Sequence, residues 1–216
     1  MLLKSRLFER VEPSRNAKLI IIYCEGKKRE DHYFNYFSEI SSQIRLEIEP
    51  PAHHDDTSPT GLLAKATNQL IPSRDNLTPK YEILEGDEVW FVIDTDSWGG
   101  KIDELRKCCD EHINWNVAQS NPCFEVWLYY HFYEFEEFDK MDISKNWKIF
   151  LNDKVAGGFD SRKHPILIST AINNAKNKFI AENNQMNIGC TEVFKLSNSF
   201  YPLVSNKIEG ALETYS

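Results

Sequence analysis

The feature that most constrains the fold of this chain is a short apolar run that ends abruptly in an acidic residue and a glycine. Residues 19–23 read LIIIY, a β-branched run typical of a strand buried on both faces. Glu25 and Gly26 end this strand, and helical spacing of apolar residues resumes after a basic turn. Open α/β sheets bind their ligands at the carboxyl ends of such strands, so Glu25 is the first candidate site residue. A structural alternative stays open, in which Glu25 caps the following helix or pairs with Lys27 or Lys28.

A second apolar strand ends in the same way. Residues 89–93 read VWFVI, and Asp94 and Asp96 follow directly at the strand end. Parallel strands bring their carboxyl ends to one edge of the sheet, so we expect Glu25, Asp94 and Asp96 to converge. Carboxylates about 4 Å apart repel by about 4 kcal/mol per pair at an effective dielectric of about 20, and a divalent cation removes that repulsion. Oxygen ligands favour Mg²⁺ or Mn²⁺, and such ions support phosphoryl transfer.

Strands that alternate with helical patterns along the chain predict an α/β fold with a mostly parallel central sheet covered by helices. The C-terminal part is predicted to be helical. We expect a single domain over 1–216, with a core at about 17–133 and a C-terminal helical extension at about 134–216. The further elements expected are strands at 45–49 and 116–119, helices at 30–41, 59–70, 102–109 and 147–151, an apolar helix opened by residues 121–122, a long helix over 165–182 and an apolar segment at 193–204.

Composition limits the function without fixing it. The formal charge of −8 argues against a purely electrostatic nucleic-acid binder, but an acidic metal site is itself a source of negative charge. The five cysteines are odd in number and lack CxxC spacing, which indicates reduced core residues of an intracellular protein. No stretch reaches the roughly 18 apolar residues of a membrane span. The sequence therefore predicts a cytoplasmic protein with no membrane partner.

Three strings carry a family resemblance: EGKKREDHYF, FVIDTD and SNPCFEVWLYYHF. Together they resemble the RloB family, whose members look like compact Toprim-domain proteins, and the resemblance extends from about residue 18 to the TEVFKLSNSF segment near residue 200. By this resemblance Glu25, Asp94 and Asp96 are the metal-binding acids and Glu125 is a further metal-binding and catalytic acid. Arg29 departs from the threonine expected in the family's turn, which affects the fine structure of the turn and not the metal site.

The resemblance implies a Mg²⁺-dependent (or Mn²⁺-dependent) Toprim-type endonuclease effector of prokaryotic antiviral defence. It also implies an ABC- or AAA-type ATPase partner encoded nearby. The substrate would be DNA or RNA, and the sequence leaves this choice and a homo-oligomer open. Two alternatives remain. The chain can be a non-catalytic Toprim-like sensor or scaffold subunit for the ATPase, or a nucleotidyltransferase on the same fold.

Other residues have weaker claims to a role in the site. Lys163, after the Gly157–Gly158 break, is a candidate catalytic cation that would stabilise a leaving group. The basic turn at residues 27–29 contacts either phosphates or solvent. We interpret His131 as a hydrogen-bonded core histidine, and His53 and His54 as part of a loop. The aromatic residues around His131 are also interpreted as core: Trp127, Tyr129, Tyr130, Phe132 and Tyr133.

Overall fold

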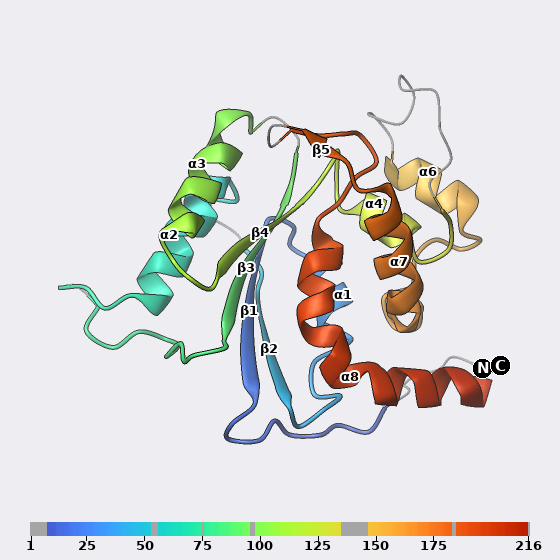
Figure 1. Ribbon diagram of the computed structural model, residues 1–216, viewed down its shortest axis with the longest axis horizontal. Coiled ribbons are helices and arrows are strands. Elements are labelled where there is room, and N and C mark those ends of the chain that lie inside the picture. Colours follow the sequence, from blue (N-terminus) through green and yellow to red (C-terminus); the bar gives the residue numbers. More distant parts are fainter. Residues whose placement is uncertain are drawn as a thin grey trace.

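The centre of the molecule is a four-stranded, entirely parallel sheet. The computed structural model describes residues 8–52, 56–74, 76–95, 98–134, 147–182 and 185–215. The strand order is β2-β1-β3-β4, with β1 at Lys18–Cys24, β2 at Ile44–Glu49, β3 at Glu88–Asp94 and β4 at Trp115–Ser120 (Figure 1). The predicted α/β class, with a parallel sheet flanked by helices and a helical C-terminal part, is confirmed, and the arrangement is consistent with a Toprim-like fold.

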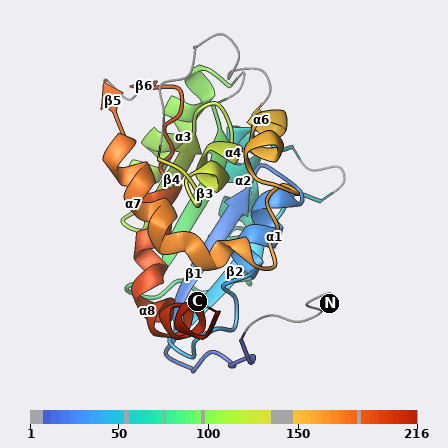
Figure 2. The ribbon, with the colours of Figure 1, turned by 90° about the vertical axis from the view of Figure 1, so that its right-hand side faces the viewer.

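Helices cover both faces of this sheet. One face carries α2 (Pro59–Leu70) and α3 (Gly100–Asp110). The other carries α1 (Arg29–Asn35), α4 (Glu125–Tyr129), α6 (Trp147–Lys154), α7 (Ile168–Lys178) and α8 (Val193–Tyr215) (Figures 1 and 2). Two buried clusters result, one on each side of the sheet.

Burial on both faces explains why the central strands are apolar without interruption. In β1, Ile20 and Ile22 point into the cluster beneath α1 and α8, while Leu19, Ile21 and Tyr23 point into the cluster beneath α2 and α3. Alternate residues of a strand face opposite sides, so both sets must be apolar. Each fully buried aliphatic side chain contributes about 1.5–3 kcal/mol, and this is the main stabilisation of the sheet.

The order of connections creates a topological switch between the two central strands. The connection from β1 runs through α1 on one face to β2, whereas the connection from β3 runs through α3 on the other face to β4. The two chain paths therefore separate at the carboxyl ends of β1 and β3. In open α/β sheets this is the place where a crevice forms and ligands bind.

Several helices have different bounds from those expected. The helix predicted over 30–41 ends at Asn35, and Glu39 has a φ of 59°, a left-handed conformation that cannot continue a helix. The helix containing Glu125 has only five residues, so His131 lies beyond it. The pattern over 165–182 divides into a 3₁₀ turn at His164–Leu167 and α7. After α7, β5 (Ala181–Glu182) pairs antiparallel with β6 (Gln185–Met186).

Other expectations agree closely with the structure, and some fall outside it. Ser58 caps α2 by accepting a hydrogen bond from the Gly61 N–H at 3.2 Å, as the Ser-Pro pair predicted. All five cysteines are free. Across the described ranges, no helix combines the length and apolar character that crossing a bilayer requires. The loop histidines at 53 and 54, the acidic stretch at 135–138 and Asp96 lie outside the described residues.

Candidate active site

Acidic residues at the carboxyl ends of β1 and β3 come together at the switch point. The backbone N–H of Glu25 donates to the Val92 carbonyl oxygen at 3.0 Å, which continues the β1–β3 pairing. The Glu25 carboxylate accepts hydrogen bonds from the Asp94 backbone N–H at 2.9 Å and from the Trp98 indole Nε1 at 3.0 Å. A carboxylate oxygen has two lone pairs, so an oxygen that accepts a hydrogen bond can also ligate a cation.

The backbone that follows Asp94 is fixed by the end of the neighbouring strand β4. Thr95 donates to the Ser120 carbonyl oxygen through its N–H at 2.8 Å and through its hydroxyl at 2.9 Å. The same hydroxyl accepts a hydrogen bond from Gln119 Nε2 at 2.9 Å, and Gln119 in turn accepts one from Arg106 at 2.9 Å. These bonds connect α3, β4 and the end of β3, and they hold Asp94 at the sheet edge.

A pocket of about 620 Å³ opens at this edge. Its walls are the turn after β1, the end of β3, the segment that leads into α4 and the start of α6. Acidic and basic side chains both line it. The lining residues that carry charge are Glu25, Lys27, Lys28, Arg29, Glu30, Asp94, Glu125 and Lys148.

Glu30 is a further acid of this pocket that the sequence analysis did not name as a site residue. It is 6% exposed, and its carboxylate lies against Gly26, where an added Cβ would collide with the Glu30 carboxylate. Within the described ranges, no side chain donates a hydrogen bond to it. Burial, and then the nearby carboxylates Glu125 and Glu25, raise the pKa of Glu30 to about 6. The available signal was an acid in the first turn of the helix that follows the strand.

Glu125 is paired with cations. Its carboxylate accepts a hydrogen bond from Arg29 Nη1 at 2.7 Å, and Lys148 Nζ lies 4.0 Å away. The Glu125 side chain is 4% exposed, and a buried carboxylate requires such compensation. Nearby, burial raises the pKa of the Cys123 thiol, and the charges of Glu125 and Asp94 raise it further. Cys123 is therefore a neutral thiol at physiological pH, unsuited to act as a thiolate nucleophile.

The donors present fit a hard divalent cation in type. Glu25 and Asp94 supply carboxylate oxygens, the ligands that Mg²⁺ and Mn²⁺ prefer, and the buried Glu30 adds a third acid that lacks a side-chain donor in the described chain. No group of three or more His, Cys, Asp or Glu side chains close enough to hold an ion occurs among the described residues. Asp96, the third acid of the sequence prediction, is not one of them.

The remaining predicted residues lie away from the pocket. Lys163 Nζ is 3.6 Å from Asp160 Oδ2, and Lys163 is not among the lining residues. His131 is a core histidine, as expected. Its ring nitrogens lie 3.1 Å from the Tyr33 hydroxyl and 3.1 Å from the Trp127 carbonyl oxygen. Burial lowers the pKa of His131 to about 3. The aromatic residues of its segment are largely buried, although Tyr133 is exposed.

Comparison with known proteins identifies a family. The family model described as RloB-like protein matches residues 20–199, which is most of the chain and includes every acid of the pocket. No curated protein and no solved structure matches the chain.

Proposed function

Because the chain belongs to the RloB-like protein family, we propose that it is a Mg²⁺-dependent nuclease that hydrolyses nucleic-acid phosphodiesters. The observation that carries the proposal is the contact between the Glu25 carboxylate and the Asp94 backbone, at 2.9 Å. It brings acids from the ends of two separate strands to one pocket at the topological switch. Acidic oxygen donors beside lysine and arginine side chains form a suitable environment for a phosphate and its metal ion.

Each group of the pocket has a distinct role in this proposal. Glu25 and Asp94, together with Asp96, would hold the ion. When bound, a divalent ion polarises a phosphoryl oxygen and lowers the pKa of a coordinated water. The basic residues of the turn after β1 and Lys148 would offset the charge of the substrate phosphates. Lys163 is paired with Asp160 and is assigned no step.

Family membership also motivates a biological setting for this activity. We place the nuclease in antiviral defence, as an effector controlled by an ABC- or AAA-type ATPase. The formal charge of −8 fits an effector that relies on a partner for a positive surface, since little counterion release is available to the isolated chain. Weak, metal-dependent binding of nucleic acid by the isolated chain is the expected behaviour.

Incubation with labelled DNA and RNA tests the proposal directly. Single-stranded and duplex substrates are offered with Mg²⁺, with Mn²⁺ and with EDTA, with and without the proposed ATPase partner. We expect cleavage that requires the metal and is lost in Asp94→Asn but kept in Asp110→Asn, a control at the exposed end of α3. Metal-independent cleavage, or equal cleavage by both variants, would overturn the proposal. Repeating the incubation with nucleoside triphosphates distinguishes a nucleotidyltransferase, which would extend the substrate.

One observation favours the non-catalytic scaffold as a second candidate. The Glu25 carboxylate accepts hydrogen bonds from Asp94 and Trp98, and this alone gives it a structural role in holding the segment after β3. A scaffold needs no metal at this edge. Thermal melts of the wild type with and without Mg²⁺ separate the two candidates, because a ligand that binds only the native state raises the melting temperature.

A further inference from the structure

The cations that line the pocket differ in how firmly they are held. Lys27 and Lys28 are exposed in the turn, and the Lys148 side chain is 72% exposed at the start of α6. The Arg29 side chain is only 39% exposed, and its guanidinium is anchored on Glu125. The position of the Arg29 charged group is therefore set by a direct hydrogen bond to a buried carboxylate.

The anchor comes from a distant part of the chain. Arg29 begins α1 and Glu125 begins α4, and both residues line the pocket. Within the described chain only Nη1 of Arg29 has a recorded partner. A guanidinium has five N–H donors in a planar fork, so most of them remain available after the bond to Glu125 forms. A fork of this kind matches the oxygens of a phosphate.

We infer that Arg29 binds a phosphate of the substrate in this pocket, and that Glu125 is the positioning residue that holds its guanidinium toward that phosphate. The inference rests on the proposed function, because the phosphate is taken to be part of a nucleic acid. It makes that proposal more specific, because one oriented guanidinium, rather than the general positive charge of the pocket, contacts the substrate. It also gives Glu125 a role that differs from direct metal binding.

The geometry distinguishes this arrangement from an ordinary surface ion pair. A surface ion pair contributes little to stability and does not depend on particular neighbouring residues. Here the acid is almost completely buried, and both partners line the pocket that also contains Glu25 and Asp94.

Binding of a fluorescein-labelled oligonucleotide, followed by anisotropy with Ca²⁺ in place of Mg²⁺ to suppress cleavage, tests the inference. We expect Arg29→Ala to weaken binding about tenfold to a hundredfold, since a hydrogen-bonded charge is lost. Arg29→Lys should restore little, because lysine keeps the charge but not the fork. The slope of log binding constant against log salt concentration should decrease in Arg29→Ala by the amount that corresponds to about one phosphate contact. Arg162→Ala is the control, since Arg162 is exposed and paired with Asp160 outside the pocket.

Glu125→Gln tests the positioning role separately. Glutamine keeps the shape of the side chain, but its neutral oxygen accepts a weaker hydrogen bond than a carboxylate does. The Arg29 guanidinium is then held less firmly in position. We expect weaker binding with an unchanged salt slope, because the number of cations is unchanged, and thermal melts establish that each variant is folded. Wild-type affinity in Glu125→Gln would overturn the positioning role. Wild-type affinity in Arg29→Ala, affinity fully restored in Arg29→Lys, or no binding by the wild type, would overturn the phosphate contact.

These outcomes are independent of catalysis. If the wild type binds the oligonucleotide through Arg29 but never cleaves with Mg²⁺, the nuclease proposal fails and the phosphate site stands. If the wild type cleaves and Arg29→Ala binds and cleaves equally well, the inference fails and the nuclease proposal stands.

Discussion

Two neighbouring parallel strands each have a glutamate at the carboxyl edge of the sheet, and the two glutamates have opposite surroundings. β1 leads directly into Glu25, and β2 ends at Glu49, which is paired in register with Tyr23 of β1. Both lie at the carboxyl edge of the sheet. Glu25 borders a pocket together with other acids, whereas Glu49 lies within a closed network of donors.

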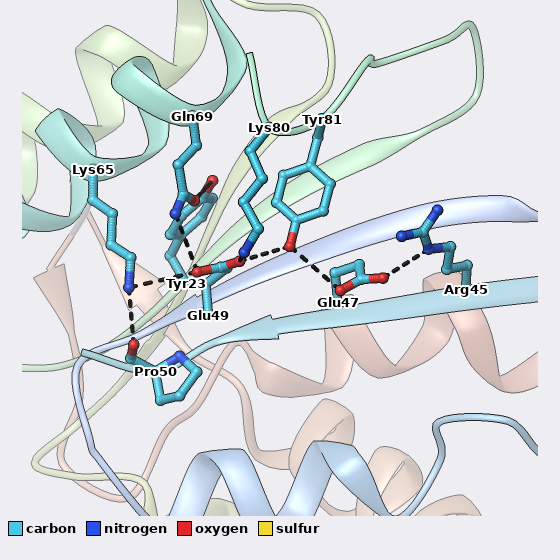
Figure 3. Close-up of polar contacts among 9 residues, drawn as sticks. All are labelled: Tyr23, Arg45, Glu47, Glu49, Pro50, Lys65, Gln69, Lys80 and Tyr81. Carbon is cyan, nitrogen blue, oxygen red and sulfur yellow. Dashed lines mark hydrogen bonds and ion pairs between the residues drawn. The ribbon is translucent and has the colours of Figure 1, made fainter. Parts of the chain in front are cut away.

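Figure 3 shows how completely Glu49 is satisfied. Its carboxylate is bonded by Lys80, by the Tyr81 hydroxyl at 2.6 Å and by Gln69 Nε2 at 3.3 Å, and Lys65 Nζ lies 3.6 Å away. Burial alone would raise the pKa of Glu49, but the hydrogen bonds from Lys80, Tyr81 and Gln69 outweigh it and hold the pKa below its ordinary value. This acid is a structural connection between β2, α2 and the loop before β3.

Glu30, on the pocket side, shows the reverse. It is as buried as Glu49, but its nearest charged neighbours include Glu125 and Glu25, and its pKa is raised to about 6. The comparison shows that an acid at the edge of a parallel sheet is not by itself a binding site. What matters is whether the surrounding elements supply cations that satisfy it or leave its charge for a ligand.

The largest effect is expected at Asp94. Asp94→Asn should reduce metal-dependent cleavage by at least about a hundredfold, because a bound ion contributes several kcal/mol to the reaction. The metal-free variant should melt at the wild-type temperature or higher, since one of several clustered charges is removed, and the shift produced by Mg²⁺ should shrink. Cleavage assays and melts with and without Mg²⁺ measure both. If the variant is destabilised and Mg²⁺ does not change the melting temperature of the wild type, then Asp94 has a structural role, as Glu49 does.

Glu49→Gln should destabilise the protein by about 2 kcal/mol at neutral pH, because Lys80 and Tyr81 lose a charged acceptor. That corresponds to a fall of about 4–8 °C in melting temperature for a chain of this size. Cleavage should be unaffected. Because the folded-state pKa is depressed, the wild-type advantage is present above the ordinary pKa of 4.5 and disappears as the pH falls through the lower folded value.

Glu47→Gln is the matched control for that substitution, on the same strand. Glu47 pairs with Arg45 at 2.7 Å, and both side chains are much more exposed than that of Glu49 (Figure 3). Its loss should cost less than about 1 kcal/mol, as is usual for exposed pairs. Equal melting temperatures for the two variants would show that the Glu49 network is not structural.

Glu30→Gln should stabilise the protein at neutral pH, whereas Glu49→Gln should destabilise it. The folded-state pKa of Glu30 is raised from 4.5 to about 6, so its stabilising contribution is complete below pH 4.5 and is lost as the pH rises through 6. At neutral pH the ionised side chain costs up to about 2 kcal/mol, and the glutamine variant should be more stable by up to that amount. Urea unfolding between pH 4 and 8 measures this. Parallel pH profiles for wild type and variant would contradict the raised pKa.

Thr95→Val should have a smaller effect on cleavage than Asp94→Asn. The substitution removes the hydroxyl that bonds Ser120 and Gln119, at a cost of about 1 kcal/mol, and it loosens the backbone after Asp94. Cleavage should fall about tenfold, with most of the change in kcat, because a misplaced ligand impairs the reaction more than substrate binding. Thr95→Ser keeps the hydroxyl and should restore activity. A serine variant as impaired as the valine variant would show that the hydroxyl is not what positions Asp94.

The sequence by itself determined the strands and the position of acids at their ends. Residues 19–24 of β1 and 89–93 of β3 are all apolar because both faces of the sheet are buried, and this pattern is local enough to identify the two strands without a structure. The strand–helix alternation likewise predicted the parallel sheet, and Ser58 and Pro59 predicted the start of α2. The first and third strands were therefore identified together with Glu25 and Asp94.

Only the tertiary structure decided which acids face a pocket. The strand order β2-β1-β3-β4 places the ends of β1 and β3 side by side at the switch, and no local pattern encodes that order. Arg29 and Glu125 are 96 residues apart, and Lys80 and Glu49 are 31 apart. Whether a buried carboxylate is neutralised depends on such long-range partners, because the electrostatic cost of burial is offset only by charges and donors that the fold brings within a few ångströms.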